Sequence, residues 1–140
     1  MLGRIEFAFS GFHSPKAQER AGPLGADFID RINAETAGLE FASPIRDLIL
    51  HTIIVDPALG QWPDKITYKR GEPAVGIAVN IAFDEWLGAS RAARVDLLAG
   101  ALIRGLRQIK ESKLPSVDRD KLEQAVERAR RLMRDAHEAN

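Results

Sequence analysis

Large apolar residues and small residues alternate along residues 74–83. The odd-numbered positions hold the large side chains, namely Val75, Ile77, Val79, Ile81 and Phe83. A period of two is typical of a β-strand, because successive side chains of a strand point to opposite faces of its sheet. The pattern therefore predicts a strand with one apolar face that packs into a core. Its other face is shallow enough for another group to lie closely against it.

The period changes after this strand. Apolar residues recur every three or four positions between Val95 and Ile109, which is the spacing of a helix face that packs against a core. Ser90 suits the N-cap of this helix, because a serine hydroxyl can accept a hydrogen bond from a free backbone N–H at a helix start. Gly100 and Gly105 lower the helix propensity of the segment, so we expect close backbone packing to be the reason for them.

Apolar runs indicate three further strands. We expect them at residues 4–12, 46–56 and 65–70, and the nearly continuous apolar character of the second predicts a central strand with both faces largely covered. Residues 70–73 contain a glycine and a proline, which predicts the turn of a hairpin into the strand at 74–83.

Two more helices are expected. One occupies residues 26–37, because glycines and a proline at residues 22–25 interrupt the helical pattern before it. The other runs from Asp118 to the end of the chain, where an apolar stripe lies opposite charged residues. Asp84 is expected to cap a short turn that carries Trp86.

This order of one strand, one helix, three strands and two helices predicts the α+β class. We expect a four-stranded, mainly antiparallel sheet with the helices packed mainly on one face. The chain has 140 residues, of which 45% are hydrophobic, so it is long enough for one core and short for two. A single domain over residues 1–140 follows.

Composition removes several classes of protein. The chain contains no cysteine, which excludes disulfides, thiolate metal sites and a cysteine nucleophile. Neither a secretory leader nor an apolar run of about 20 residues is present, so we expect a cytoplasmic protein without a membrane segment. The net charge is zero, but residues 1–85 carry 8 basic and 12 acidic side chains and the remainder 12 and 8. An acidic half could meet a basic partner.

The residues that usually carry catalysis are sparse. His13, His51 and His137 lack the spacing of metal ligands, and His51 falls in a strand where a hydrogen-bonded core histidine is expected. Asp84 and Glu85 are explained by helix capping, and no glycine-rich phosphate loop is present. We therefore predict no catalytic residue, no cofactor and no metal, and expect a protein that acts by binding.

Two surface features remain open. Four arginines of the last helix alternate with acidic residues that would repel phosphates, so we expect a solvated helix face and no direct binding of nucleic acid. They are Arg128, Arg130, Arg131 and Arg134. Trp62 lies in an irregular loop, where a large aromatic residue can cover the core or anchor a protein interface.

With these elements in place, the chain resembles the small α+β immunity proteins of bacterial polymorphic-toxin and contact-dependent growth-inhibition systems, and in particular the immunity protein 44 family. Structural positions carry the resemblance, and they follow one another along most of the chain. These are the first strand ending in Ser10-Gly11-Phe12, residues 48–55, 66–70 and 79–90, the long helix, and Val117-Asp118 at the start of the last helix.

The resemblance implies a cytoplasmic protein without enzymatic activity that binds one cognate toxin domain, often a nuclease, as a monomer in a 1:1 complex. Such a protein would block the active site or substrate surface of the toxin, and acidic loops suit a cationic nuclease site. On loop position and charge, we expect the toxin-binding residues to be Asp56, Trp62, Asp64 and Glu72.

Two other classes remain. A small-molecule-binding or enzymatic domain could use the shallow strand face at Gly76, Ala78 and Asn80, provided that no helix covers it. A homo-oligomeric interaction module could instead associate through the C-terminal helix.

Overall fold

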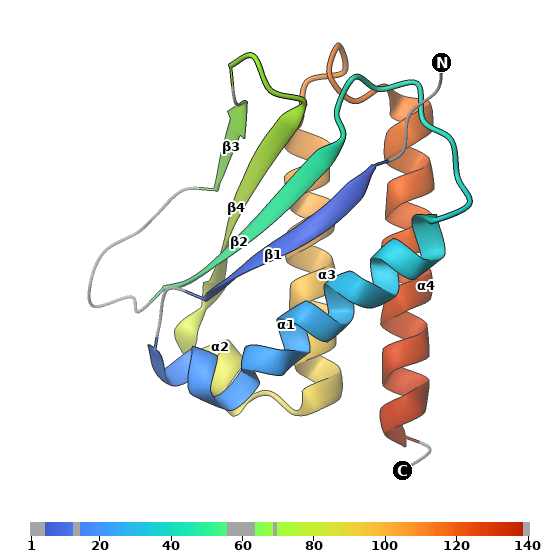
Figure 1. Ribbon diagram of the computed structural model, residues 1–140. Helices are drawn as coiled ribbons and strands as arrows, with labels where there is room; N and C mark the ends of the chain where they lie inside the picture. The colour runs from blue at the N-terminus through green and yellow to red at the C-terminus, as the bar shows by residue number, and fades with distance from the viewer. Residues whose placement is uncertain (1–4, 13–14, 56–63, 69, 139–140) are drawn as a thin grey trace.

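A computed structural model describes residues 5–12, 15–55, 64–68 and 70–138. These residues form one sheet and four helices, which Figure 1 shows in their arrangement. The elements in chain order are β1 (Glu6–Phe12), α1 (Pro15–Thr36), β2 (Asp47–Val55), β3 (Lys65–Tyr68), β4 (Ala74–Ala82), α2 (Phe83–Gly88), α3 (Arg91–Gln108) and α4 (Ser116–Glu138). No helix within these described ranges is long and apolar enough to cross a membrane.

The four strands form a mixed sheet in the order β1-β2-β4-β3. β1, β2 and β4 are mutually parallel, and β3 alone pairs antiparallel, as the edge partner of β4. The α+β class is confirmed, but the prediction of a mainly antiparallel sheet is wrong. A helix connects β1 to β2 and returns the chain to the end of the sheet where β1 began, which makes the two strands parallel.

The hairpin between β3 and β4 is confirmed. Its turn contains Gly71 with a φ of 77°, a conformation that favours glycine. The hairpin places β4 beside β2 rather than leaving β3 there, so β2 is central as predicted. Only one face of β2 faces the helices, however, and Ile49 on its other face is half-buried.

Helix α1 is longer than the predicted helix at residues 26–37. It continues through Pro23, which cannot donate a backbone hydrogen bond. Leu24 and Gly25 within the expected break are buried, so packing against the core offsets the hydrogen bond lost at the proline. The sequence indicated the local destabilisation of a helix by proline and glycine, but it could not indicate that the core would bury Leu24 and Gly25.

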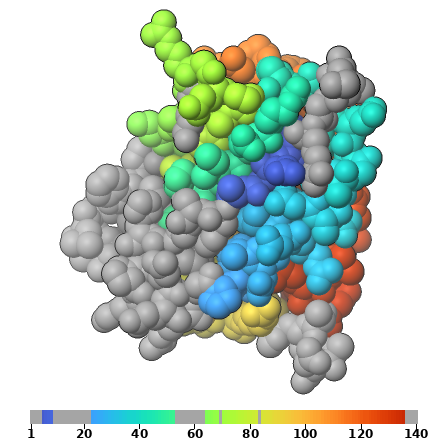
Figure 2. Space-filling view, in the orientation of Figure 1, coloured from blue at the N-terminus to red at the C-terminus, as the bar shows by residue number. Residues whose placement is uncertain are grey.

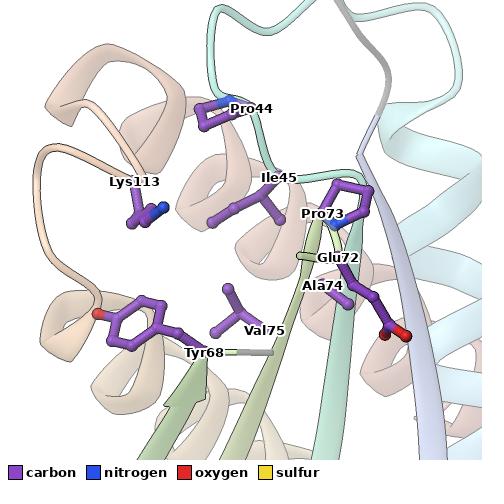
Figure 3. Close-up of a pocket in the computed structure, with 8 residues that line it drawn as sticks. All are labelled: Pro44, Ile45, Tyr68, Glu72, Pro73, Ala74, Val75 and Lys113. Carbon is purple, nitrogen blue, oxygen red and sulfur yellow. The ribbon is translucent and has the colours of Figure 1, made fainter. Parts of the chain in front are cut away.

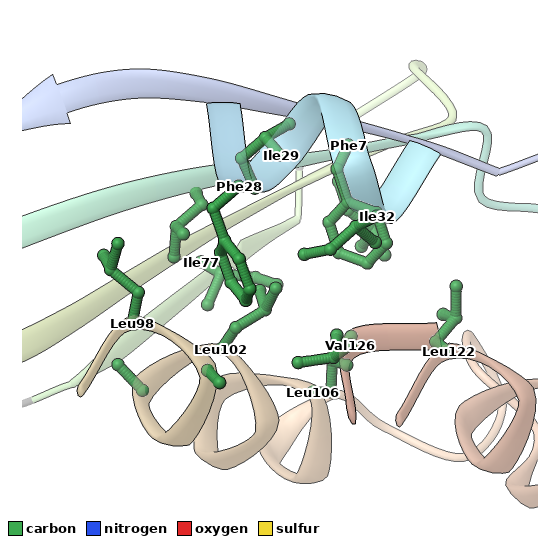
Figure 4. Close-up of a cluster of buried hydrophobic side chains, with 14 of the residues drawn as sticks. Phe7, Phe28, Ile29, Ile32, Ile77, Leu98, Leu102, Leu106, Leu122 and Val126 are labelled. Carbon is green, nitrogen blue, oxygen red and sulfur yellow. The ribbon is translucent and has the colours of Figure 1, made fainter. Parts of the chain in front are cut away.

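The hydrophobic core lies between the sheet and the helices. In Figure 4, Phe28 of α1, Ile77 of β4 and Leu102 of α3 converge in this layer. Helices α1 and α3 contact the sheet, and α4 packs against both of these helices. The apolar stripe of α4 is therefore largely used inside the chain, although Leu132 remains exposed.

Two predictions at helix starts have different outcomes. Ser90 is the N-cap of α3, and its Oγ accepts a hydrogen bond from Ala93 N at 3.2 Å, as predicted. Asp84 is not a cap, because α2 starts at Phe83 and its N-cap is Ala82. Asp84 instead lies in the first turn, where a negative charge interacts favourably with the helix dipole.

Candidate functional site

Three connecting segments meet at the end of the sheet where the parallel strands begin. They are the segment before β2, the turn between β3 and β4, and the connection between α3 and α4 (Figure 1). A cavity of about 70 Å³ lies between them, and Figure 3 shows the residues that line it. Its lining is mostly apolar and consists of Pro44, Ile45, Tyr68, Glu72, Pro73, Ala74, Val75 and Lys113.

Hydrogen bonds fix these segments to one another. The backbone carbonyl of Pro73 accepts from Arg46 N at 2.7 Å and from Asp47 N at 3.1 Å, which ties the turn to the start of β2. The hydroxyl of Ser43 donates to the carbonyl of Lys113. Tyr68 Oη accepts from Lys110 N at 2.8 Å. The cavity therefore has a braced frame, which lowers the entropic cost of binding a partner there.

Asp118 also holds one of these segments in place, a role that the sequence did not indicate. This carboxylate is 1% exposed and accepts hydrogen bonds from Ala42 N at 3.2 Å and Ser43 N at 2.6 Å. It lies in the first turn of α4, so it joins that helix to the segment before β2. Its position was visible as the opening of a helix, but its partners lie more than 70 residues away in the chain.

Glu72 is the predicted toxin-binding residue that lies at this site. Its side chain is exposed on the turn before β4, and no ion pair joins it to any residue that the structure describes. Figure 3 shows the side chain extending away from Tyr68 and Lys113. In Figure 2 the segment around the turn, in yellow-green, projects from the top of the molecule. The turn thus presents a carboxylate to solvent beside an apolar cavity.

Asp64 has a different environment. Its Oδ2 pairs with Arg104 Nε at 2.5 Å and accepts a hydrogen bond from Gln108 Nε2 at 3.3 Å, and its Oδ1 accepts one from Asn80 N at 2.9 Å. The side chain is only 16% exposed. Burial raises the pKa of this carboxyl, but the hydrogen bonds from Arg104 and Asn80 and the charge of Arg104 outweigh it and hold the pKa below its usual value.

The structure does not bring Asp64 and Glu72 together. Asp64 lies beside Asn80 and Glu72 precedes Ala74, so six residues of β4, or about 20 Å, separate the two ends of the hairpin. One interface of ordinary size could still include both. Asp56 and Trp62 lie outside the described residues.

The strand face of Gly76, Ala78 and Asn80 carries no helix within the described part of the chain, since α3 packs on the opposite face. Gly76 lies between Thr67 and His51, whose Nε2 is 3.8 Å from the position of a Cβ at Gly76. His51 is therefore half-buried on the open face and is not a core residue, contrary to expectation. No group of residues within the described ranges could hold a metal ion.

Ion pairs occupy most of the arginines of α4. Arg128 pairs with Glu35 of α1 at 2.9 Å, and Arg130 and Arg134 pair with Asp96 of α3 at 3.1 and 2.8 Å. A charged groove of about 610 Å³ between α3 and α4 contains three arginines and three carboxylates. Equal numbers of positive and negative side chains line this groove, and the absence of direct nucleic-acid binding stays a prediction.

Comparison with known proteins gives one match. No curated protein and no solved structure matches the chain significantly. The family model described as immunity protein 44 matches residues 16–131, from α1 into α4. The matched region contains Asp64, Glu72 and the whole frame of the cavity. Because the match covers well over half of the chain, the protein belongs to the immunity protein 44 family.

Proposed function

We propose that this protein neutralises one cognate bacterial toxin domain by binding it and blocking its active site or substrate surface. The membership of the immunity protein 44 family supports an immunity role. The toxin would be the C-terminal domain of a polymorphic or contact-dependent growth-inhibition protein. The protein would act in the cytoplasm, as a monomer in a 1:1 complex and without catalysis.

The observation that carries this proposal is the braced turn with Glu72. Its carboxylate is exposed and unpaired among the described residues, while the neighbouring cavity offers apolar walls at Pro44, Pro73 and Val75. A basic side chain of a partner could place its aliphatic part against these walls and its charge near Glu72. Nuclease active sites are commonly cationic because their substrates are anionic, so a nuclease is the toxin that we propose.

Asp64 takes a supporting part in the proposed interface. Arg104 already neutralises this carboxylate, so its main contribution would be to hold the start of β3 against α3. Asp56 and Trp62 precede it in the chain and complete the proposed toxin-binding set. An aromatic residue such as Trp62 would contribute most if the partner buried it fully.

Co-expression with the toxin domain encoded by the gene immediately upstream tests the proposal. We expect the two proteins to purify together in equal amounts. Glu72→Lys should weaken this complex by at least about tenfold, because a charge reversal at an interface anchor costs about 2 kcal/mol or more. Glu111→Lys is the matched control, since Glu111 is also exposed at this end of the molecule but does not line the cavity. Equal affinities of both variants and the unaltered protein would remove Glu72 from the interface.

A further inference from the structure

The two edges of the sheet differ in whether other groups of the described chain bind their outward backbone N–H and C=O groups. At the β1 edge, Glu6 N donates to the carbonyl of Arg46, the residue just before β2, so the next residue, Phe7, directs its backbone groups outward. The side chain of Asn33 on α1 binds both groups: Phe7 N donates to Asn33 Oδ1 at 2.8 Å, and Asn33 Nδ2 donates to Phe7 O at 2.8 Å. At Phe7, the amide of Asn33 thus makes the two hydrogen bonds that a further strand would make.

The directions of the backbone groups of β4 define the other edge. Pro73 O receives hydrogen bonds from residues at the start of β2, whereas Asn80 N donates to Asp64 on the side of β3. Along a strand these directions alternate, so the even-numbered residues of β4 direct their N–H and C=O groups toward β3. In β3, Lys65 and Thr67 face those residues in the register and must form the hydrogen bonds of the hairpin.

It follows that Ile66 and Tyr68 direct their backbone N–H and C=O groups to the free edge of β3. No hydrogen bond from any part of the chain that the structure describes reaches these groups. Unpaired groups of this kind are a template for another strand. Lys65 of β3 and Arg70 of the turn that follows are exposed, and Lys110 lies over the Tyr68 ring at 5.4 Å.

Asp64 at the start of β3 does not offset these positive charges, because Arg104 neutralises it, and Glu72 lies beyond Arg70 on the turn. A basic edge resists pairing with a second copy of itself, since lysines would then face lysines. The same charge favours an extended segment that carries acidic residues. Backbone geometry and charge together therefore specify the occupant.

We propose that β3 is a docking strand, and that an extended acidic segment of the toxin adds to its free edge as a fifth strand. This inference rests on the proposed neutralisation of a toxin and specifies how the partner is held. Main-chain hydrogen bonds to Ile66 and Tyr68 supply attachment, and Lys65 selects acidic side chains on the open face of the sheet. The carboxylate of Glu72 at the end of the hairpin then fixes the register, because it meets a basic residue of the partner.

Amide hydrogen exchange of the ¹⁵N-labelled protein, followed by NMR with and without the toxin domain, tests this mode. In the free protein, Ile66 and Tyr68 should exchange fast, while Lys65 and Thr67 exchange slowly. In the complex, exchange at Ile66 and Tyr68 should slow by at least about tenfold. Slow exchange of Ile66 and Tyr68 in the free protein would show that the edge is already covered, and this would overturn the proposal.

A matched pair of variants supplies a second measurement. Ile66→Pro removes the outward N–H without removing a hairpin hydrogen bond, whereas Ile66→Val keeps it. We expect the proline variant to bind the toxin domain at least about tenfold more weakly and the valine variant to bind normally. A complex that forms without protection of Ile66 and Tyr68, and that tolerates Ile66→Pro, overturns the docking strand alone. If the unaltered protein binds no toxin domain, the proposed function fails as well.

Discussion

Two glycines of α3 show how different the roles of one residue type can be. A Cβ at Gly105 would lie 2.2 Å from Ile77 Cγ2 and 3.3 Å from Val79 Cγ1, so the absence of a side chain allows α3 to approach the sheet. Gly100 is exposed, and nothing lies within 4 Å of the corresponding position. The expected close packing contact is thus confirmed at Gly105 and wrong at Gly100.

Gly105→Ala and Gly100→Ala should therefore change stability in opposite directions. The first inserts a methyl group against the stiff, buried side chain of Ile77 and should destabilise the protein by about 1–3 kcal/mol. The second should stabilise it by up to about 1 kcal/mol, because alanine has the higher helix propensity. Urea unfolding of both variants measures this difference. Similar destabilisation by the two substitutions would contradict the packing account.

The ion pair of Asp64 should appear in the dependence of stability on pH. Its pKa in the folded protein lies below the unfolded value of about 3.9, so the stabilisation is complete above that value and is lost as the pH falls through the lowered folded pKa. Asp64→Asn should therefore reduce the free energy of unfolding at pH 7, and the deficit should shrink below about pH 4.

Arg104→Gln supplies the control for this prediction. It removes the main partner of Asp64 and should reproduce most of the pH-dependent deficit, so the double variant should be little worse than either single one. Chemical unfolding at a series of pH values gives the free energy of unfolding against pH for the unaltered protein, the two single variants and the double variant. A deficit of Asp64→Asn that stays constant down to pH 2 would show that the carboxylate charge is not the stabilising feature.

At the scale of elements, the sequence predicted where strands and helices lie better than how they pair. Alternation located β4, and an apolar stripe located α3, because both patterns are local consequences of facing one core. The position of β4 between β2 and β3 is not a local property. It depends on the pairing of β2 with β4 over nine positions. The sequence of either strand alone does not indicate which strand it pairs with.

The residues of the candidate site also differ in how far the sequence predicted their surroundings. The exposure of Glu72 could be predicted, because a charged residue in a turn between strands is exposed in most folds, whereas its part in toxin binding stays a prediction. The ion pair of Asp64 and the burial of Asp118 could not, because their partners come from distant segments. A buried carboxylate and a surface carboxylate look alike in a single sequence.

Asn33 is the residue that joins α1 to the edge of β1. Asn33→Ala should destabilise the protein by about 1–3 kcal/mol, because it leaves the N–H and C=O of Phe7 without their partners. Asp30→Ala, at an exposed position of the same helix, should have little effect. Thermal unfolding compares the two variants, and an equally small loss of stability in both would contradict the role assigned to Asn33.

In the whole molecule, the sheet and the helices together support the β3–β4 hairpin. The helices cover one face of the sheet, ion pairs join α4 to its neighbouring helices, and the β3–β4 hairpin carries Glu72 at its turn and Asp64 at the start of β3. A rigid hairpin supported by a large core is suited to present a binding surface with little reorganisation. The family of the protein supports a role in immunity.

Survival of bacteria that express the cognate toxin domain is the most direct test of that role. The domain encoded upstream is induced in cells with and without this protein, and viable cells are counted over time. We predict that the protein restores growth fully and that Glu72→Lys restores it less well. Death at the same rate in the presence of abundant soluble protein would contradict the account.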